Sequence, residues 1–288
     1  MSLFVGSGVA IVTPFDEDNN INYEKLNELI EFQLENQTDA IIIAGTTGEA
    51  ATMDEKEHVE LVRYTVEKVN KRVPVIAGAG GNNTKKAIRL SKEFEKIGVD
   101  GLLHVTPYYN KTTKEGLYRH FKEIAQSVKT PIMLYNVPSR TNMNIPVDVV
   151  KRLSEFENIV AIKDATGDLS YAQSLRVEVP NIDIYSGNDD LIVPLLSIGA
   201  KGVVSVLANI KPKQTHDIVK SYLDGDVEKA SKLQLEYYKL IKALFKETNP
   251  IPVKKALNIM GFEVGSLRLP LIDASKEVEE ELRELLDD

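Results

Sequence analysis

The chain has 288 residues, a formal net charge of −8, 43% hydrophobic residues and no cysteine. An acidic balance argues against nucleic acid or an anionic membrane as partner, because both attract basic faces. Without cysteine there is no disulfide, thiol nucleophile or Cys-ligated zinc. No apolar run approaches the roughly 20 residues that cross a bilayer, and the N-terminus lacks the features of a secretory signal. We therefore expect a soluble, cytoplasmic protein with a large core.

Eight short β-type runs recur along the chain with helical segments between them. Their spacing of roughly 20 to 33 residues is that of a βα unit. The runs begin near Val9, Ala40, Val73, Gly101, Pro131, Ile159, Ile182 and Gly202. Because each run is nearly all apolar, the pattern predicts a closed parallel (β/α)₈ (TIM) barrel. A doubly wound sheet is the competing fold, but the first turn, residues 13–16, lacks its Gly-rich phosphate loop.

The segments between the strands have helical periodicity and end signals. Apolar residues from Tyr23 to Leu34 form one stripe. Asp54, followed three residues later by Glu57, predicts a capping box at the start of the second helix. Gly98, just after Ile97, is placed to end the third helix.

The eight strands are used up by about residue 206, and the rest of the chain is predicted to be helical. A helix near residues 212–223 completes the barrel. One further helix carries Leu233, Tyr237, Leu240, Ile241 and Leu244, another spans about 253–260, and the last begins after Ser275. We predict a catalytic barrel domain over residues 1–224 and a helical extension over 225–288. No Pro/Ser/Gly-rich linker separates them.

The most informative position is Lys163, at the end of the sixth apolar run, Ile159-Val160-Ala161-Ile162. An ammonium group withdrawn from water costs several kcal/mol unless it loses its proton. A deprotonated, desolvated lysine can form a Schiff base with a carbonyl substrate. The alternative is that Lys163 extends to the surface and makes an ion pair there.

Active sites of such barrels lie where the strands end. The second strand ends in the Gly-Thr-Thr-Gly turn 45–48, whose amides and hydroxyls could bind a carboxylate, or which could simply cap a helix. Tyr135, at the end of the fifth strand, could relay protons or be a core tyrosine. Arg140, just beyond, suits a substrate carboxylate but could equally be an exposed surface residue.

Three more strand ends supply Tyr108-Tyr109, Ser186-Gly187 and Val204-Ser205. Together, a lysine, a tyrosine, two threonines and an arginine at one barrel mouth fit an α-keto acid substrate. They do not fit a metal hydrolase, because the four histidines have no paired spacing. We expect no metal and no cofactor. The four histidines are His58, His104, His120 and His216.

Four motifs make the chain resemble the dihydrodipicolinate synthase/N-acetylneuraminate lyase superfamily of pyruvate-dependent class I aldolases. They are GTTGE at 45–49, TPYYN at 106–110, YNVPSRT at 135–141 and IKDATGD at 162–168. The resemblance covers essentially the whole chain. It implies a lyase without cofactor that condenses pyruvate with L-aspartate 4-semialdehyde, in diaminopimelate and lysine biosynthesis.

The resemblance also implies residue roles. Lys163 would form the pyruvate imine, and Tyr135, Thr47 and Tyr109 would relay protons, with Tyr109 reaching across a tight dimer interface into the neighbouring site. Arg140 would receive the carboxylate of the aldehyde. Further substrate-binding positions would be Thr46, Gly187 and the main-chain carbonyl of Val204. The expected assembly is a homotetramer built as a dimer of dimers.

Within the superfamily, Thr46-Thr47 and Arg140 favour the synthase over the sialic acid lyases. A lyase of sialic acid or of a 2-keto-3-deoxy sugar acid, and a non-catalytic keto-acid sensor, remain alternatives. Feedback-inhibited members bind lysine through positions that here include Ala50, Glu55 and Lys86. Since Lys86 would repel the effector's ammonium by on the order of 1 kcal/mol, we expect weak or absent inhibition by lysine.

Overall fold

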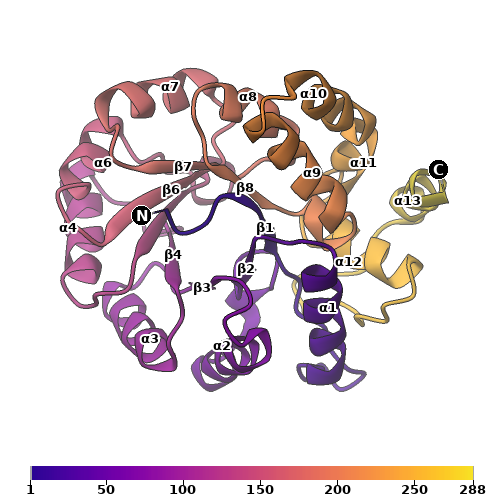
Figure 1. The fold of residues 1–288 in the computed structure, drawn as a ribbon. Coiled ribbons are helices and arrows are strands. Elements are labelled where there is room, and N and C mark those ends of the chain that lie inside the picture. The colour runs from indigo at the N-terminus through magenta and orange to yellow at the C-terminus, as the bar shows by residue number, and fades with distance from the viewer. Residues whose placement is uncertain (1, 288) are drawn as a thin grey trace.

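The computed structural model describes residues 2–287, which form a closed barrel of eight parallel strands, each paired with its neighbours in chain order (Figure 1). The strands are β1 Gly6–Ala10, β2 Ala40–Ile43, β3 Val75–Gly78, β4 Gly101–Val105, β5 Ile132–Asn136, β6 Ile159–Asp164, β7 Asp183–Ser186 and β8 Gly202–Ser205. The predicted TIM barrel is confirmed, and seven strands begin within two residues of their predicted starts.

The predicted start of β1 at Val9 is wrong, because the strand begins at Gly6. Gly6 has little strand propensity of its own. Its conformation is set by the closure of the barrel, where it pairs with Gly202 of β8. A Cβ atom on Gly202 would lie 1.8 Å from the Gly6 carbonyl oxygen, so this seam requires a glycine. Long-range pairing therefore determines where β1 begins.

Helices surround the barrel, and four more follow it. The surrounding ones are α1 Tyr23–Glu35, α2 Glu55–Val69, α3 Thr84–Ile97, α4 Lys114–Ala125, α5 Pro138–Thr141, α6 Val147–Leu153, α7 Leu169–Glu178, α8 Ile192–Ser197 and α9 Pro212–Leu223. The C-terminal ones are α10 Val227–Glu236, α11 Tyr238–Leu244, α12 Ile251–Ile259 and α13 Lys276–Asp287. Short 3₁₀ helices cover Ala50–Thr52, Asp189–Leu191 and Leu207–Asn209.

The predicted helix ends are confirmed at Gly98 and in part at Asp54. Gly98 follows α3 in the left-handed conformation, with φ of 91°. Asp54 accepts a hydrogen bond from the Glu57 amide at 2.9 Å. The second hydrogen bond of a capping box, from the Asp54 amide to the Glu57 carboxylate, is not formed, because that carboxylate pairs with Arg268 of the C-terminal segment.

One predicted C-terminal helix is two, α10 and α11, which meet at Tyr237. The backbone hydrogen bonds Tyr237 N to Leu233 O (3.2 Å) and Ile241 N to Tyr237 O (2.9 Å) continue across the break. The apolar periodicity therefore runs through it unchanged, which is why the sequence pattern did not reveal it. The domain division at residue 224 stays a prediction.

Apolar side chains form a layer inside the barrel and a larger one between strands and helices. The inner layer includes Ile42, Ile76, Leu103, Met133 and Tyr185. It supports the mouth from below, so residues one step further along each strand lie at the opening. Within residues 2–287 no helix is long and apolar enough to span a membrane.

Candidate active site

Lys163 and Tyr135 lie side by side on β6 and β5, where they are partners in the parallel register. Both are 6% exposed. The Lys163 Nζ lies 4.3 Å from the centre of the Tyr135 ring. The prediction that the Lys163 side chain is buried is therefore confirmed, and the surface alternative is wrong. A desolvated amine can act as a nucleophile toward a carbonyl, and a tyrosine beside it can carry protons.

The amine faces a cavity of about 170 Å³, which we call the inner cavity. Drug-sized ligands usually occupy roughly 300–1,000 Å³, so this volume suits a small molecule. Its walls bring together residues from the ends of β2, β5, β6 and β7, among them Thr46, Thr47, Tyr135, Arg140, Lys163 and Gly187. Six predicted site residues thus share one cavity.

The Gly-Thr-Thr-Gly turn after β2 forms one wall of the inner cavity. Within the described chain, neither the Thr46 nor the Thr47 amide donates to another backbone group. Ala44 and Glu49, on either side of the turn, have φ of 53° and 56°, which side chains rarely adopt. Amides without a backbone partner, together with the two hydroxyls, have the chemistry that a carboxylate ligand requires.

A glycine on the neighbouring strand makes room for this turn. A Cβ atom on Gly78 of β3 would lie 2.1 Å from the Ala44 carbonyl oxygen. The backbone after β2 can therefore turn back over β3 only because residue 78 has no side chain.

Asn249, just before α12, is a site residue that the sequence reasoning missed. It lines the inner cavity, is 6% exposed, and donates from its side-chain amide to the Thr47 hydroxyl at 3.0 Å. Its carbonyl accepts a hydrogen bond from Arg140 at 2.8 Å. The only local signal was an Asn-Pro pair, which marks a turn rather than a site.

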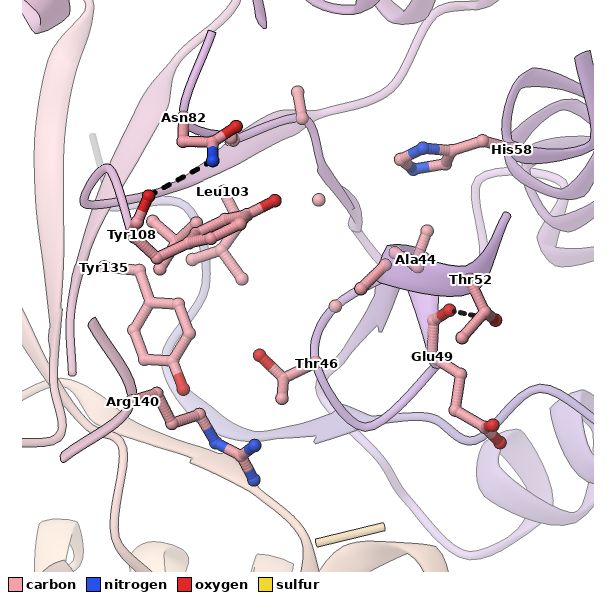
Figure 2. Close-up of a pocket in the computed structure, with 18 of the residues that line it drawn as sticks. Ala44, Thr46, Glu49, Thr52, His58, Asn82, Leu103, Tyr108, Tyr135 and Arg140 are labelled. Atoms are coloured by element: carbon pink, nitrogen blue, oxygen red, sulfur yellow. Dashed lines mark hydrogen bonds between the residues drawn. The ribbon is translucent and has the colours of Figure 1, made fainter. Parts of the chain in front are cut away.

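A second cavity of about 370 Å³, the outer cavity, opens beside the first. The two share Thr46, Tyr135 and Arg140 in their walls. Figure 2 shows the Tyr135 phenol pointing toward Thr46 and the Arg140 guanidinium, while His58 lies at the far side. Arg140 and Tyr135 thus lie where the two cavities meet.

Gly187 and Val204, both predicted substrate-binding positions, lie in different surroundings. Gly187 lines the inner cavity, whereas Val204 is 1% exposed inside β8, and Val206 forms the wall there. The buried carboxylate of Asp189 accepts hydrogen bonds from the amides of Val206 and Leu207. Burial raises the pKa of Asp189, and its hydrogen bonds and the nearby Lys163 oppose this. Asp189 fixes the loop after β8.

Tyr109 does not join the site within this chain. It is 96% exposed and has φ of 67°. Hydrogen bonds from Asn82 to the Tyr108 carbonyl (3.1 Å) and from Asn110 to the Asn82 carbonyl (2.9 Å) hold its loop (Figure 2 shows the first). The loop thus presents an aromatic side chain to solvent in a conformation that its neighbours stabilise.

The four histidines have different surroundings, and one of them, His216, pairs with Asp39 at 2.8 Å. In the described residues no group of three His, Asp or Glu side chains is arranged to hold a metal ion. His104 is fully buried, and its Nε2 lies 3.2 Å from the Ser91 hydroxyl. Burial lowers the pKa of His58 and of His120 to about 4.

A TIM barrel with a buried lysine and a tyrosine at its mouth defines a site of the class I aldolase type. The chain belongs to the dihydrodipicolinate synthetase family, whose model matches residues 3–288. It is therefore an enzyme, a lyase of that superfamily, as the motifs predicted.

Relatives and solved structures agree over the full length. A 4-hydroxy-tetrahydrodipicolinate synthase of Acetivibrio thermocellus is 57% identical over 99% of this chain and 97% of its own. One of Clostridium tetani is 59% identical over 94% and 92%. The crystal structure of dihydrodipicolinate synthase from Aquifex aeolicus has a TM-score of 0.97 and 44% identity, covering 99% of this chain and 97% of that one.

Proposed function

We propose that this chain is a 4-hydroxy-tetrahydrodipicolinate synthase, which condenses pyruvate with L-aspartate 4-semialdehyde in the diaminopimelate route to lysine. The observation that carries the proposal is Lys163 buried beside Tyr135 in a cavity of keto-acid size. The names of the relatives support the choice of substrates.

The reaction begins when the neutral amine of Lys163 attacks the keto carbon of pyruvate. The resulting carbinolamine loses water and becomes an imine, and loss of a methyl proton gives an enamine. The enamine carbon then attacks the aldehyde. Finally, the amine of the aldehyde substrate attacks the imine carbon, which closes the ring and releases Lys163. Tyr135, with Thr47 and the partner chain's copy of Tyr109, carries the protons.

The carboxylates of the two substrates have separate partners. Thr46 and Thr47 bind the carboxylate of pyruvate through the turn's free N–H groups and hydroxyls. Arg140, which lies where the two cavities meet, binds the carboxylate of the aldehyde. Gly187 and the carbonyl of Val204 complete the pocket in this proposal.

The catalytic unit in this proposal is a dimer, and the assembly is a homotetramer in the cytoplasm. The support is Tyr109, which is exposed here and is held in position by its own loop. Dissociated monomers should therefore lose turnover but still form the imine. Measuring both activities across a dilution series that crosses the dimer dissociation constant tests this.

Trapping of the imine tests the covalent step. Reduction with borohydride in the presence of pyruvate should add one reduced adduct to Lys163, and mass spectrometry of the peptide locates it. Active enzyme with an unmodified lysine would refute the mechanism. A coupled assay with L-aspartate 4-semialdehyde against N-acetylmannosamine separates the synthase from a sialic acid lyase.

Inhibition by lysine should be weak or absent. Lys86 lines the outer cavity together with His58, Asn82 and Tyr108. Glu55 is already engaged by Arg89 through two bonds of 2.6 and 2.7 Å. The cavity therefore offers a cation, and no free carboxylate from residue 55, to an ammonium group. Half-inhibition at micromolar lysine would overturn this expectation.

A further inference from the structure

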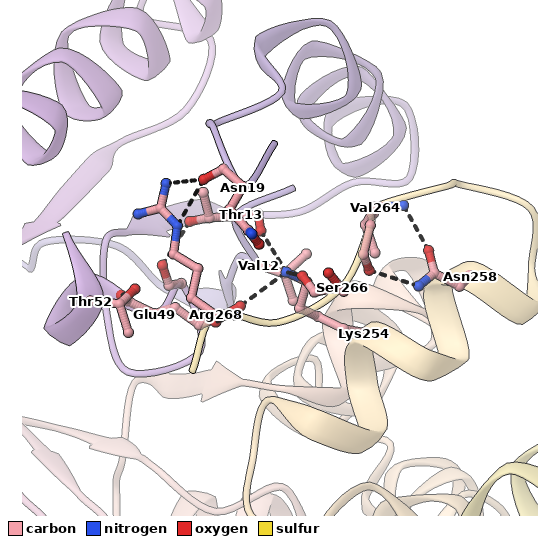
Figure 3. Close-up of polar contacts among 12 residues, drawn as sticks. Val12, Thr13, Asn19, Glu49, Thr52, Lys254, Asn258, Val264, Ser266 and Arg268 are labelled. Atoms are coloured by element: carbon pink, nitrogen blue, oxygen red, sulfur yellow. Dashed lines mark hydrogen bonds and ion pairs between the residues drawn. The ribbon is translucent and has the colours of Figure 1, made fainter. Parts of the chain in front are cut away.

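Lys254 of α12 is fully buried and yet belongs to the C-terminal extension, not to the barrel mouth. Its neighbours on the helix, Ile251, Val253, Ala256 and Leu257, are buried apolar residues. The Lys254 Nζ donates to the carbonyls of Thr13 (3.0 Å) and Ser266 (2.7 Å) and to the Glu49 carboxylate (2.9 Å), as Figure 3 shows. All three of its protons therefore have acceptors.

The Glu49 carboxylate is held equally tightly. Its side chain is 0% exposed, and its second oxygen accepts a hydrogen bond from the Arg268 amide at 3.0 Å. Its backbone carbonyl accepts one from the Thr52 hydroxyl at 2.9 Å. Glu49 is also the residue in the left-handed conformation that ends the Gly-Thr-Thr-Gly turn. A fixed side chain thus sets a strained backbone position next to the substrate.

The same helix reaches the turn at two further points. Thr13, whose carbonyl binds Lys254, donates its hydroxyl to the Gly48 carbonyl at 2.7 Å. Asn249, two residues before α12, donates to the Thr47 hydroxyl. Thr47 and Gly48 of the turn and Glu49 just after it are therefore tied to α12 or to the residue pair before it, directly or through Thr13.

Stability alone does not account for a buried ion pair at this place. Replacing such a pair by apolar residues of similar volume is often neutral or stabilising, because desolvation of the two charges is costly. A hydrogen-bonded pair, by contrast, fixes distance and direction, which an apolar contact does not. The fixed element here carries Thr46 and Thr47, which line the inner cavity and whose amides have no backbone acceptor in the described chain.

We propose that Lys254 and Glu49 are positioning residues that set the Thr46–Thr47 turn for the carboxylate of the keto acid. Helix α12 of the C-terminal extension is thereby part of the active-site framework. The proposal rests on the proposed function, because it takes this turn as the place where pyruvate binds. It assigns no contact between Lys254 and the substrate.

Kinetics of Lys254→Met test the proposal, since methionine keeps the length of the side chain and removes its donors. The KM for pyruvate should rise about tenfold or more, because small misplacements of binding groups are costly. The KM for the aldehyde should stay within about threefold, since Arg140 binds it. Assays run well below the thermal midpoint of each variant, so that unfolding does not contribute.

The double variant Lys254→Met/Glu49→Gln separates positioning from stability. It removes the unpaired buried carboxylate, so its thermal midpoint should recover toward wild type while the pyruvate KM stays high. A pyruvate KM that recovers together with the thermal midpoint, or one unchanged in Lys254→Met, overturns the proposal.

Lys255→Met is the matched control. Lys255 is the next residue on α12 and pairs with Glu279 of α13 at 3.0 Å, away from the turn. Its pyruvate KM should equal that of wild type; an equal rise in both variants would also overturn the proposal. Failure of the proposed function looks different, because wild-type protein would then form no imine at Lys163, or would form it without turning over L-aspartate 4-semialdehyde.

Discussion

Lys163 and Lys254 are both buried lysines, but their surroundings differ. Lys254 is 0% exposed and meets three acceptors, one of them a carboxylate. Lys163 is 6% exposed and faces an aromatic ring and a cavity, and the described residues give it no ion pair. Burial is therefore common to both lysines, and what distinguishes Lys163 is the lack of an ion pair in the described residues and an adjoining cavity, which in the proposed function leaves room for a carbonyl substrate.

The partners of Lys254 also oppose the effect of burial. Burial lowers the pKa of Lys254, and the Glu49 carboxylate acts in the other direction. A lysine that keeps its proton holds a carboxylate in place but cannot attack a carbonyl. In the proposed function Lys254 thus serves the structure and Lys163 the chemistry, so substitutions at the two positions should differ in kind.

The largest effect is expected at Lys163. Lys163→Met should abolish the borohydride-trapped adduct and reduce turnover to the detection limit, because the nucleophile is gone. Its thermal midpoint should equal or exceed that of wild type, since the variant no longer buries an amine without a charge partner. Mass spectrometry and a thermal scan measure the two effects. A clear fall in the midpoint would mean that Lys163 has an unrecognised structural partner.

Removal of the phenol comes next. Tyr135→Phe should slow turnover by roughly 10²–10⁴-fold, the usual range for loss of a proton-transfer group. The fold should persist, because the ring that packs against the Lys163 amine remains. Steady-state kinetics with a circular dichroism control measure this. Turnover within a factor of three of wild type would remove Tyr135 from the relay.

Lys254→Met should lower the thermal midpoint, whereas Lys163→Met should not. Removing one partner of a buried ion pair lowers the free energy of unfolding by roughly 3–5 kcal/mol, because the charge of the other partner stays buried without compensation. Thermal scans at a fixed protein concentration measure this for both lysine variants and for Lys255→Met. Equal thermal midpoints for Lys163→Met and Lys254→Met would contradict the proposed difference between the two lysines.

The sequence predicts the buried Lys163 but not the buried Lys254. Lys254 also interrupts an apolar face, Ile251 to Leu257, but it lies on a helix outside the predicted barrel mouth. Its partner Glu49 is 205 residues away in sequence. The barrel and the strand-end residues were predictable because they repeat with a local period. Contacts between the extension and the β2 turn have no such period, and neither does the start of β1 at Gly6.

Arg140 should show a smaller, substrate-selective effect. Arg140→Lys keeps the charge but loses the planar fork, so the KM for the aldehyde should rise by about 10–100-fold, as for the loss of one hydrogen bond to a charged group. Imine formation with pyruvate should stay near wild type, because the turn that binds it is untouched. Separate measurement of the two half-reactions tests this. An equal loss in both half-reactions would mean that Arg140 binds the carboxylate of pyruvate.

The smallest effect concerns the buried imidazole of His120. Burial lowers the pKa of His120 to about 4, below its ordinary value of 6.5. Between these two values the unfolded chain binds more protons than the folded one, so stability falls as the pH falls through this window. From pH 7 to 5.5 the loss should be about 1 kcal/mol for this side chain.

His120→Gln should reduce that slope, because glutamine does not titrate and can still reach the Thr84 hydroxyl, 2.9 Å from the imidazole. Urea unfolding at the two pH values measures the difference. His104, whose pKa burial lowers to about 3 with help from the charge of His120, should keep part of the slope. An unchanged slope in His120→Gln would mean that water reaches the imidazole and that its burial does not lower its pKa.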